Sequence, residues 1–329
     1  MRGMPVEWTV GATAFLSRDW ASLVESDPDT TFFQTPRYLK LYWEAFGSQF
    51  PQLASVHDGD EAISAAAFDV TERTVTFLGG FEITDYMGPV GLRQGQERAA
   101  KELMASLAAR DDWETADFRG LALDAGWHGA LADGARDAAL AVEVGDDGVA
   151  PLLPLASSFE AYLSRLPGKL RHELRRKRRR LHRALPTARL VDATTSTFAD
   201  DITTFVQLHR ASKGRKGRFM YEGMERFFER LGDALLPDGT FRLVFLESDG
   251  AKLAGAVGFR DRGRFLLYNS AYDHARADLS PGIVLMTMLI EELIREGCEA
   301  LDLLKGDEEY KFRLGATPRP IGRLLVRRR

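Results

Sequence analysis

One stretch, residues 271–315, constrains the fold of this chain more than any other: AYDHARADLSPGIVLMTMLIEELIREGCEALDLLKGDEEYKFRLG. Apolar residues repeat at helical spacing between Ser280-Pro281-Gly282 and Gly297, which predicts an amphipathic helix over 282–296. A short apolar strand over 300–304 and a charged helix from Asp307 follow. The stretch therefore predicts a strand, a turn, a helix, a strand and a helix in that order.

The turn that opens the amphipathic helix is suited to hold an anion. Ser280 can cap the helix, Pro281 fits the first helical position, and Gly282 lets a ligand approach the backbone closely. The exposed N–H groups and the positive end of the helix dipole favour a group such as a pyrophosphate. We predict that this turn grips a phosphorylated acyl donor.

Composition limits the class of protein. The 329 residues are 45% apolar and 28% charged, so the chain can bury a sizeable core, and its length favours two domains. No apolar run is long enough to span a bilayer and no secretory signal is visible, so we expect no membrane span and a cytoplasmic location. The single cysteine, Cys298, cannot form an internal disulfide. The six histidines show no ligand spacing, so no metal is expected.

The second half of the chain shows a regular order of elements. Turn signals at Asp249-Gly250 and Arg262-Gly263 separate three strands, as hairpins require. The predicted elements are an arginine-rich helix over 169–184, a strand over 187–192, helices over 199–211 and 222–235, strands over 241–247, 253–260 and 265–272, and, after residue 307, a last strand over 321–326.

The first half repeats this order more faintly, which predicts two modules of mixed α/β structure. The Gly/Asp-rich segment 145–148 suggests the boundary, giving modules over 1–148 and 149–329. Residues 1–150 carry 11 basic and 25 acidic side chains, a net charge of −14, whereas residues 151–329 carry 33 and 23, a net of +10. This asymmetry favours an anionic ligand on the second module and an amine attracted by the first.

The Ser-Pro-Gly turn, the helix and the string LDLLKGDEEYKFRLG are similar to the C-terminal signature of the CelD/BcsL-type acetyltransferases, relatives of the Fem aminoacyl ligases within the GNAT superfamily. The resemblance implies two tandem GNAT-like modules packed around a shared cleft, with mixed sheets. The second module would hold the donor, and the first, which lacks the Ser-Pro-Gly turn, would shape the acceptor site. The implied activity is transfer of an acetyl or other acyl group from acyl-CoA to a primary amine, on a small molecule or a peptide.

The resemblance and the chemistry together name candidate residues. Direct attack of an amine on a thioester needs a base, an oxyanion donor and a general acid for the leaving thiolate. Tyr310 lies where GNAT enzymes often carry the tyrosine that protonates this thiolate. The other candidates are Asp307, Glu308 and, from a loop resembling the Asp-Tyr segment of CelD-like proteins, Asp85 as bases, with Lys305 and Tyr272 at the donor.

The arginine-rich helix holds nine Lys and Arg residues against one acid, Glu173. Its apolar stripe of Leu170, Leu174 and Leu181 would anchor it. Three interpretations stay open: a clamp for the phosphates of CoA, through residues such as Arg175 and Arg179; a track for the backbone of tRNA; or a solvated face. A second basic cluster, from Lys213 to Arg218, could extend the same surface.

Two other functions compete with acyl-CoA-dependent transfer. Fem relatives with similar loops use aminoacyl-tRNA as the donor, which makes a Fem-like ligase the first alternative. A non-catalytic factor in polysaccharide biosynthesis or export is the second. The sequence leaves the acceptor amine and the oligomeric state open.

Overall fold

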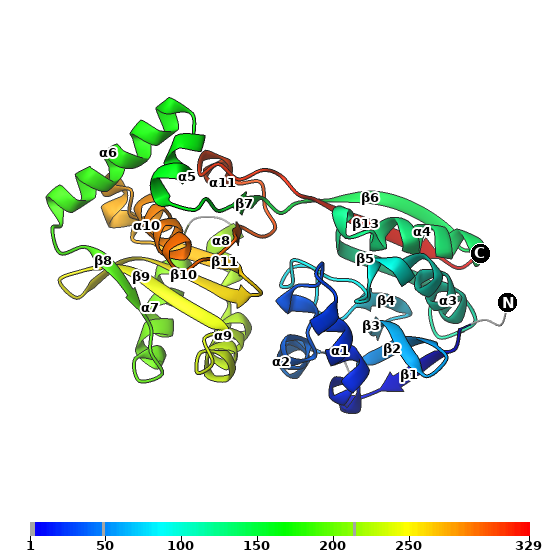
Figure 1. The fold of residues 1–329 in the computed structure, drawn as a ribbon. Coiled ribbons are helices and arrows are strands. Elements are labelled where there is room, and N and C mark those ends of the chain that lie inside the picture. Colours follow the sequence, from blue (N-terminus) through cyan, green and yellow to red (C-terminus); the bar gives the residue numbers. More distant parts are fainter. Residues whose placement is uncertain (1–3, 48–49, 213–214) are drawn as a thin grey trace. The chain divides into compact units, whose positions relative to one another are not determined.

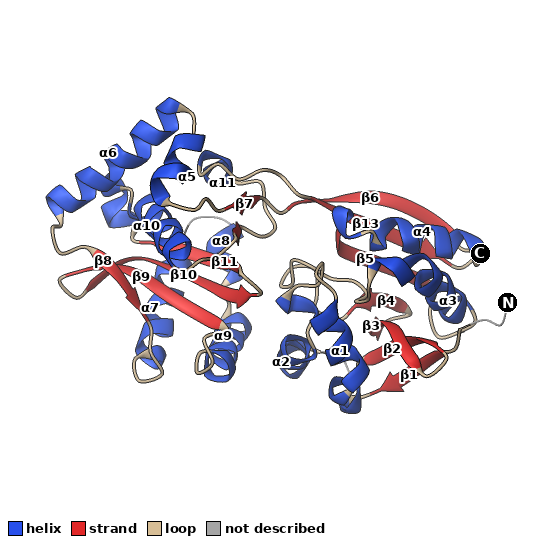
Figure 2. Cartoon of the chain, in the orientation of Figure 1, coloured by secondary structure: helices blue, strands red, loops and turns tan. Residues whose placement is uncertain are grey.

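The computed structural model describes residues 4–47, 50–212 and 215–329 and divides the chain into two units (Figure 1). Unit 1 contains Met1–Ala150 and Arg319–Arg329, and unit 2 contains Pro151–Pro318. Each unit is built around one mixed sheet packed against helices (Figure 2). Within the described ranges, no helix is both long enough and apolar enough to cross a membrane.

Unit 1 has a seven-stranded sheet in the order β1-β2-β3-β4-β5-β13-β6. Its core gathers aromatic side chains of the sheet and apolar side chains of α3 and α4, because the buried positions of these strands alternate. The strands are β1 Val6–Val10, β2 Gln52–Asp58, β3 Glu61–Thr71, β4 Thr74–Phe77, β5 Thr115–Ala122, β6 Ala141–Val149 and β13 Pro320–Arg327. The helices are α1 Arg18–Ser26, α2 Pro36–Phe46, α3 Gln96–Ala108 and α4 Trp127–Asp137, with short 3₁₀ turns at Ala12–Leu16, Phe32–Gln34, Arg93–Gly95 and Leu123–Ala125.

Unit 2 has a six-stranded sheet in the order β7-β12-β11-β10-β9-β8. Helices α5, α6 and α10 share one core with the sheet. Phe228 of α9 packs against Phe205 of α7 and against Tyr268 of β11. The strands are β7 Leu152–Pro154, β8 Arg189–Asp192, β9 Phe241–Ser248, β10 Ala251–Asp261, β11 Arg264–Tyr272 and β12 Ala300–Asp302. The helices are α5 Phe159–Arg165, α6 Gly168–Ala184, α7 Phe198–Arg210, α8 Arg215–Phe219, α9 Glu222–Leu235, the 3₁₀ turn His274–Leu279, α10 Pro281–Arg295 and α11 Glu309–Arg313.

The hairpin predictions are confirmed. Asp249 and Gly250 have φ values of 50° and 80°, and Arg262 and Gly263 have 45° and 78°. Two consecutive left-handed residues are what a tight two-residue hairpin turn requires. These turns set the antiparallel register of β9, β10 and β11.

The two units repeat one order of elements. In unit 1, three antiparallel strands, β2 to β4, lead through α3 to β5, which pairs parallel with β4. In unit 2, β9 to β11 lead through α10 to β12, which pairs parallel with β11. The paired residues of β11 and β12 run only from Arg264 with Ala300 to Leu266 with Asp302. The two strands therefore part beyond Leu266, and the predicted strand over 300–304 ends at Asp302 instead.

The last strand of the chain differs from its prediction. The sequence assigns 321–326 to the second module, whereas β13 lies between β5 and β6 in the sheet of unit 1. Ile321, Leu324 and Val326 are fully buried there. The pattern of a strand indicates which face it buries, but the sheet that it joins is decided by pairing with distant strands, here β5 and β6.

The predicted boundary also differs. Residues 145–148 lie within β6, where they pair with β13, and the division into units falls after Ala150. The Gly/Asp-rich segment is therefore not a linker. Its glycines allow the register of β6 and β13 to shift between Ile321 and Gly322. The C-terminal segment Arg319–Arg329 brings five arginines and no acid into unit 1, so the net charge of unit 1 is −9 and that of unit 2 is +5. Part of the predicted asymmetry is therefore balanced inside unit 1, for example by Arg323 with Asp117.

The place of β13 predicts which unit a core substitution weakens. All five tryptophans lie in unit 1, so tryptophan fluorescence follows the unfolding of that unit alone. Leu324→Ala removes fully buried methyl groups and should cost about 2–5 kcal/mol of the free energy of unfolding. We expect the fluorescence-detected urea midpoint to fall.

Leu301→Ala is the matched control, because Leu301 is as deeply buried but lies on β12 in unit 2. It should lower a transition seen by circular dichroism and leave the fluorescence transition in place. A fluorescence midpoint that responds to Leu301→Ala and not to Leu324→Ala would contradict the assignment of β13.

Candidate active site

A cavity of about 350 Å³ lies in unit 2 beside the start of α10. Four separate segments supply its lining: α6, the last residues of β11, the turn and first residues of α10, and α11. Because β11 and β12 part beyond Leu266, the end of β11 is free to border this cavity. Four residues predicted from the sequence lie together here, namely Tyr272, Ser280, Gly282 and Tyr310.

Tyr310 is the half-buried aromatic residue of α11 that lines the cavity. Its phenol shares a hydrogen bond with the hydroxyl of Ser270 on β11. Burial, and then the negative charge of Glu308, raise the pKa of Tyr310 well above its ordinary value. The phenol therefore keeps its proton at neutral pH and can donate it.

Ser280 differs from its prediction as a helix cap. It occupies the position before α10, but its side chain makes no capping hydrogen bond. Its backbone is left-handed, with φ 54° and ψ 47°, a conformation that costs a non-glycine residue about 1 kcal/mol or more. Ser280 is one of the residues that line the cavity. Pro281 is the first residue of α10, as predicted.

Gly282 makes room for a side chain of the protein. A Cβ atom built on Gly282 would lie 3.2 Å from Cδ1 of Tyr272, which is tighter than ordinary packing. The Tyr272 ring also lies with its centroid 4.4 Å from that of His274. Gly282 also lines the cavity, and close approach of a ligand to its backbone stays a prediction.

A buried lysine binds the backbone of residues 304–306, the segment that follows β12. Lys311 is only 3% exposed, and its Nζ donates to the carbonyl oxygens of Leu304, Lys305 and Gly306 at 3.0, 3.1 and 3.2 Å. Nζ also lies 3.0 Å from Oε2 of Glu308. Four oxygens around one ammonium fix the path of the chain that leads into α11.

The predicted acids and lysine of this segment therefore have different surroundings. Glu308 stands at the N-cap of α11 and is paired with Lys311, while Asp307 is exposed and precedes the helix, which begins at Glu309. Lys305 is half-buried, and its backbone carbonyl is one of those that Lys311 binds. None of the three lines the cavity that contains Tyr310.

Lys177 is a site residue that the sequence prediction missed. It is the residue of α6 that lines the cavity. Its Nζ lies 3.0 Å from Oε1 of Glu173, whose other oxygen is paired with Arg313, the last residue of α11. The hydrogen bond from Lys177, and to a lesser extent that from Arg313, hold the pKa of Glu173 below its ordinary value, although partial burial of the carboxylate acts in the opposite direction. The signal was present in the sequence, since Lys177 lies one helical turn after the single acid of the basic segment.

Arg175 and Arg179, predicted to bind the donor, line a different hollow. This second groove, of about 620 Å³, lies among α5, α6 and α10 and shares no lining residue with the first. Nine basic residues on one helix cannot all face one side, since successive residues turn by about 100°. Of the second basic cluster, Lys213 lies outside the described residues, and Arg218 is an exposed residue of α8.

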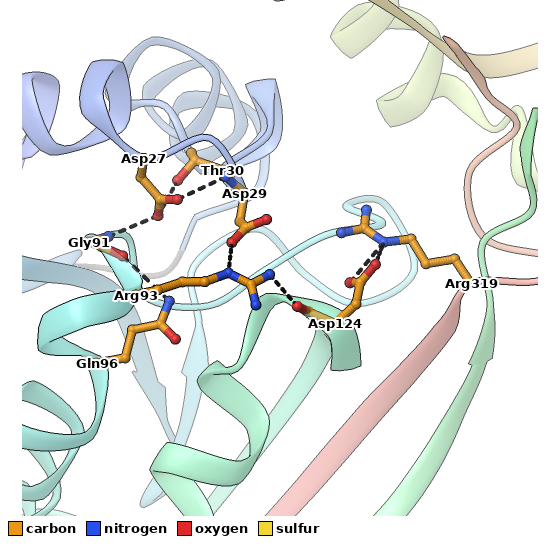
Figure 3. Close-up of polar contacts among 8 residues, drawn as sticks. All are labelled: Asp27, Asp29, Thr30, Gly91, Arg93, Gln96, Asp124 and Arg319. Atoms are coloured by element: carbon orange, nitrogen blue, oxygen red, sulfur yellow. Dashed lines mark hydrogen bonds and ion pairs between the residues drawn. The ribbon is translucent and has the colours of Figure 1, made fainter. Parts of the chain in front are cut away.

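The predicted acceptor loop around Asp85 belongs to unit 1 and is anchored by charged side chains. Buried Asp27 accepts hydrogen bonds from the backbone N–H of Gly91 at 2.9 Å and from the hydroxyl of Thr30 at 2.8 Å (Figure 3). Arg319 of the C-terminal segment binds both carboxylate oxygens of Asp124, at 2.9 and 2.8 Å.

The same loop carries Asp85 and Tyr86 at different depths. Tyr86 is 2% exposed, with the Arg319 guanidinium 5.1 Å from its ring centroid, so it packs as a core residue of unit 1. Asp85 is half-buried, and its role as a base stays a prediction.

Two further kinds of reactive group can be described here, namely clusters of side chains that could hold a metal ion and the thiol of Cys298. No group of three or more His, Cys, Asp or Glu side chains that could hold a metal ion occurs among them. Cys298 is half-buried after α10, and burial raises the pKa of its thiol, which disfavours the thiolate.

The geometry can now be compared with known proteins. Residues 168–312 match the family described as "Acetyltransferase (GNAT) domain". A search of curated protein sequences finds no match. Among solved structures, FemX has a TM-score of 0.69 at 12% identity, covering 93% of this chain and 95% of FemX. L-PGS from Bacillus licheniformis has a TM-score of 0.60 at 13% identity, covering 94% and 91%. A tandem GNAT protein from the clavulanic acid biosynthesis pathway has 0.50 at 13%, covering 98% of each chain.

These likenesses establish a tandem GNAT-like fold, as predicted. At such low identity the structural matches speak for the fold alone, whereas the domain match covers most of unit 2. Residues 168–312 of unit 2 are therefore similar to a GNAT acetyltransferase domain. The cavity beside α10, with Tyr310 at its wall, lies within these residues.

The buried lysine generates a prediction about this site. Lys311→Met keeps the length of the side chain but leaves three carbonyl oxygens without their shared donor, so the free energy of unfolding should fall by about 2–4 kcal/mol. Amide hydrogens of residues 303–306 should also exchange faster. Hydrogen exchange followed by mass spectrometry measures both effects.

Lys169→Met is the control, because Lys169 is exposed on α6 and its loss should change neither quantity. If Lys311→Met left exchange in residues 303–306 unchanged, the ammonium would not be what holds this segment.

Proposed function

We propose that this protein is an N-acyltransferase that transfers an acetyl or other acyl group from acyl-CoA to a primary amine. The observation that carries the proposal is the cavity beside α10, which is lined by Tyr310, Ser280 and Lys177. The GNAT domain match and the tandem GNAT fold support an acyltransferase. The CelD/BcsL-type resemblance of the sequence is consistent with the same activity.

The donor would enter along the edge of β11. Beyond Leu266 this edge has no strand partner among the described residues, so its backbone groups can bind amides of the extended CoA chain. The start of α10 offers N–H groups, and Ser280 and Lys177 offer a hydroxyl and a positive charge for the pyrophosphate. In this arrangement Lys177 takes the part first given to Arg175 and Arg179, and Tyr272 shapes the wall.

The reaction needs one proton removed and one supplied. The amine nitrogen attacks the thioester carbon, a C–N bond forms, the C–S bond breaks, and the thiolate takes a proton. Tyr310, which lines the cavity and whose phenol carries its proton at neutral pH, would supply that proton. We assign removal of the amine proton to Asp307, which is exposed and has no ion-pair partner among the described residues, whereas Glu308 is paired with Lys311. Lys305 and Asp85 remain candidates for oxyanion and acceptor contacts.

A Fem-like ligase that uses aminoacyl-tRNA is the second candidate. The similarity to FemX over nearly the whole chain favours it, and the basic helix α6 offers charge for an RNA backbone. In both cases an amine would attack the acyl carbon and Tyr310 would protonate the leaving group, which is the thiolate of CoA in one case and the ribose oxygen of tRNA, released as the C–O ester bond breaks, in the other.

The general-acid assignment gives a kinetic prediction. Tyr310→Phe removes the phenolic proton and keeps the ring, so kcat for acyl transfer should fall about 10²-fold or more while KM for the donor changes little. Tyr221→Phe is the matched control, because Tyr221 is 53% exposed in the same unit. An unchanged kcat in Tyr310→Phe would remove the catalytic role.

The donor assignment gives a binding prediction. CoA at about a hundredfold its dissociation constant should stabilise the protein by about 2.7 kcal/mol and raise the unfolding midpoint by several degrees, and Lys177→Gln should reduce the shift. Calorimetry with CoA and with total tRNA, at two salt concentrations, measures this. No shift with CoA and a salt-sensitive shift with tRNA would favour the ligase instead.

A further inference from the structure

The groove among α5, α6 and α10 has no part in the proposed transfer. Its volume of about 620 Å³ is in the range of small-molecule sites, and its lining is separate from that of the cavity beside Tyr310. Helix α6 supplies four arginines and His182 to one wall, and α10 supplies Thr287 and Glu291 to the other.

Two of the four arginines are neutralised within the groove and two are not. Arg175 lies 2.7 Å from Glu160, and Arg178 lies 2.5 Å from Glu291, so these pairs tie α6 to α5 and α10. Arg179 and Arg183 are exposed, stand one helical turn apart, and have no ion-pair partner among the described residues. The groove therefore holds two guanidinium groups whose charge is left for an anion.

The other side chains of the groove are apolar. Leu163 and Leu174 are buried at its base, and Phe159 is half-buried, with the Arg178 guanidinium 5.8 Å from its ring centroid. Burial and the nearby charge of Arg178 lower the pKa of His182, which agrees with a positive field here. Apolar side chains next to the two unpaired arginines suit a ligand that has a ring or an alkyl chain at one end and a strong anion at the other.

A bilayer fits this helix less well than a small molecule does. Leu174 and Leu181 are buried in the core of unit 2, and Leu170 packs against the same core. The apolar stripe of α6 is therefore buried inside the protein, whereas an interfacial membrane helix needs an exposed apolar face that inserts into the bilayer.

We propose that this groove binds a small phosphorylated molecule, with its ring resting on Phe159 and its phosphate held by Arg179 and Arg183. Guanidinium groups match phosphate oxygens with two parallel hydrogen bonds each, which makes a pair of arginines a strong phosphate site. The site is separate from the donor cavity and does not depend on the acyl-transfer proposal.

The test compares two double variants with the same change of charge on the same helix. Arg179→Gln/Arg183→Gln removes the two free cations of the groove, and Arg171→Gln/Arg176→Gln removes two arginines that do not line it. Binding of ADP, as a phosphorylated ring compound, and of inorganic phosphate is measured by titration calorimetry on the full chain. We expect ADP to bind the unaltered protein more tightly than phosphate does, and the groove variant to weaken ADP binding about tenfold or more while the control keeps it.

Further arms separate the alternatives. Lys177→Gln should weaken CoA and leave ADP binding unchanged, and the groove variant should leave CoA binding unchanged. If both double variants weakened ADP binding equally, the binding would reflect general charge attraction and the proposed site would be wrong. Loss of CoA binding in the groove variant would also contradict it, because the two sites would then not be separate. Binding to phosphatidylcholine vesicles that carry phosphatidic acid, lost in the groove variant while ADP fails to bind at all, would assign the arginines to a membrane and overturn the small-molecule proposal.

Discussion

The candidate site depends on the buried ammonium of Lys311. Where β12 leaves the sheet after Asp302, the carbonyl groups of the next residues lose their strand partners and need donors inside the protein. Lys311 supplies one charged group to three of them, and so fixes the segment that leads into α11. Tyr310 is the preceding residue of the same short helix, so the contact that holds the segment also sets the tyrosine at the cavity wall. The contacts of Lys311 therefore both stabilise residues 304–306 and position Tyr310 at the cavity.

The C-terminal strand places a second constraint on the molecule. The chain passes from unit 1 to unit 2 after Ala150 and returns after Pro318, so unit 1 is discontinuous in sequence. At this double passage the backbone of Ala150 donates to Arg319, and that of Leu152 pairs with Thr317. Unit 1 consequently cannot complete its sheet before the whole of unit 2 has been made, which places β13, the last strand, among the most distant pairings in the chain.

Elements with strong local signals were predictable from the sequence. Helices α6, α9 and α10 begin and end within a residue or two of their expected bounds, and the left-handed pair at Asp249 and Gly250 follows from turn chemistry. Helices α4, α5 and α8 and strands β6 and β7 were missed, and β6 includes the Gly/Asp-rich segment that was interpreted as a linker. At the site, Tyr310 and Ser280 could be placed from local pattern and resemblance. The contacts of Lys311, the left-handed backbone of Ser280 and the ring of Tyr272 over Gly282 arise from tertiary packing, which a local pattern does not contain.

Helix α6 shows how one basic sequence can serve two different surfaces. Lys177 lines the cavity that contains Tyr310, whereas Arg175, Arg178, Arg179 and Arg183 line the second groove. Lys177 is held by Glu173, which also binds the end of α11, so its charge is fixed beside the cavity and its flexible stem is ordered before any ligand arrives. Arg179 and Arg183 face the other side with their charge uncompensated. A paired cation contributes little net field and much positional order, whereas an unpaired one attracts anions at the expense of order. The single acid of the segment, Glu173, thus orders Lys177, the residue of α6 that lines the candidate active site.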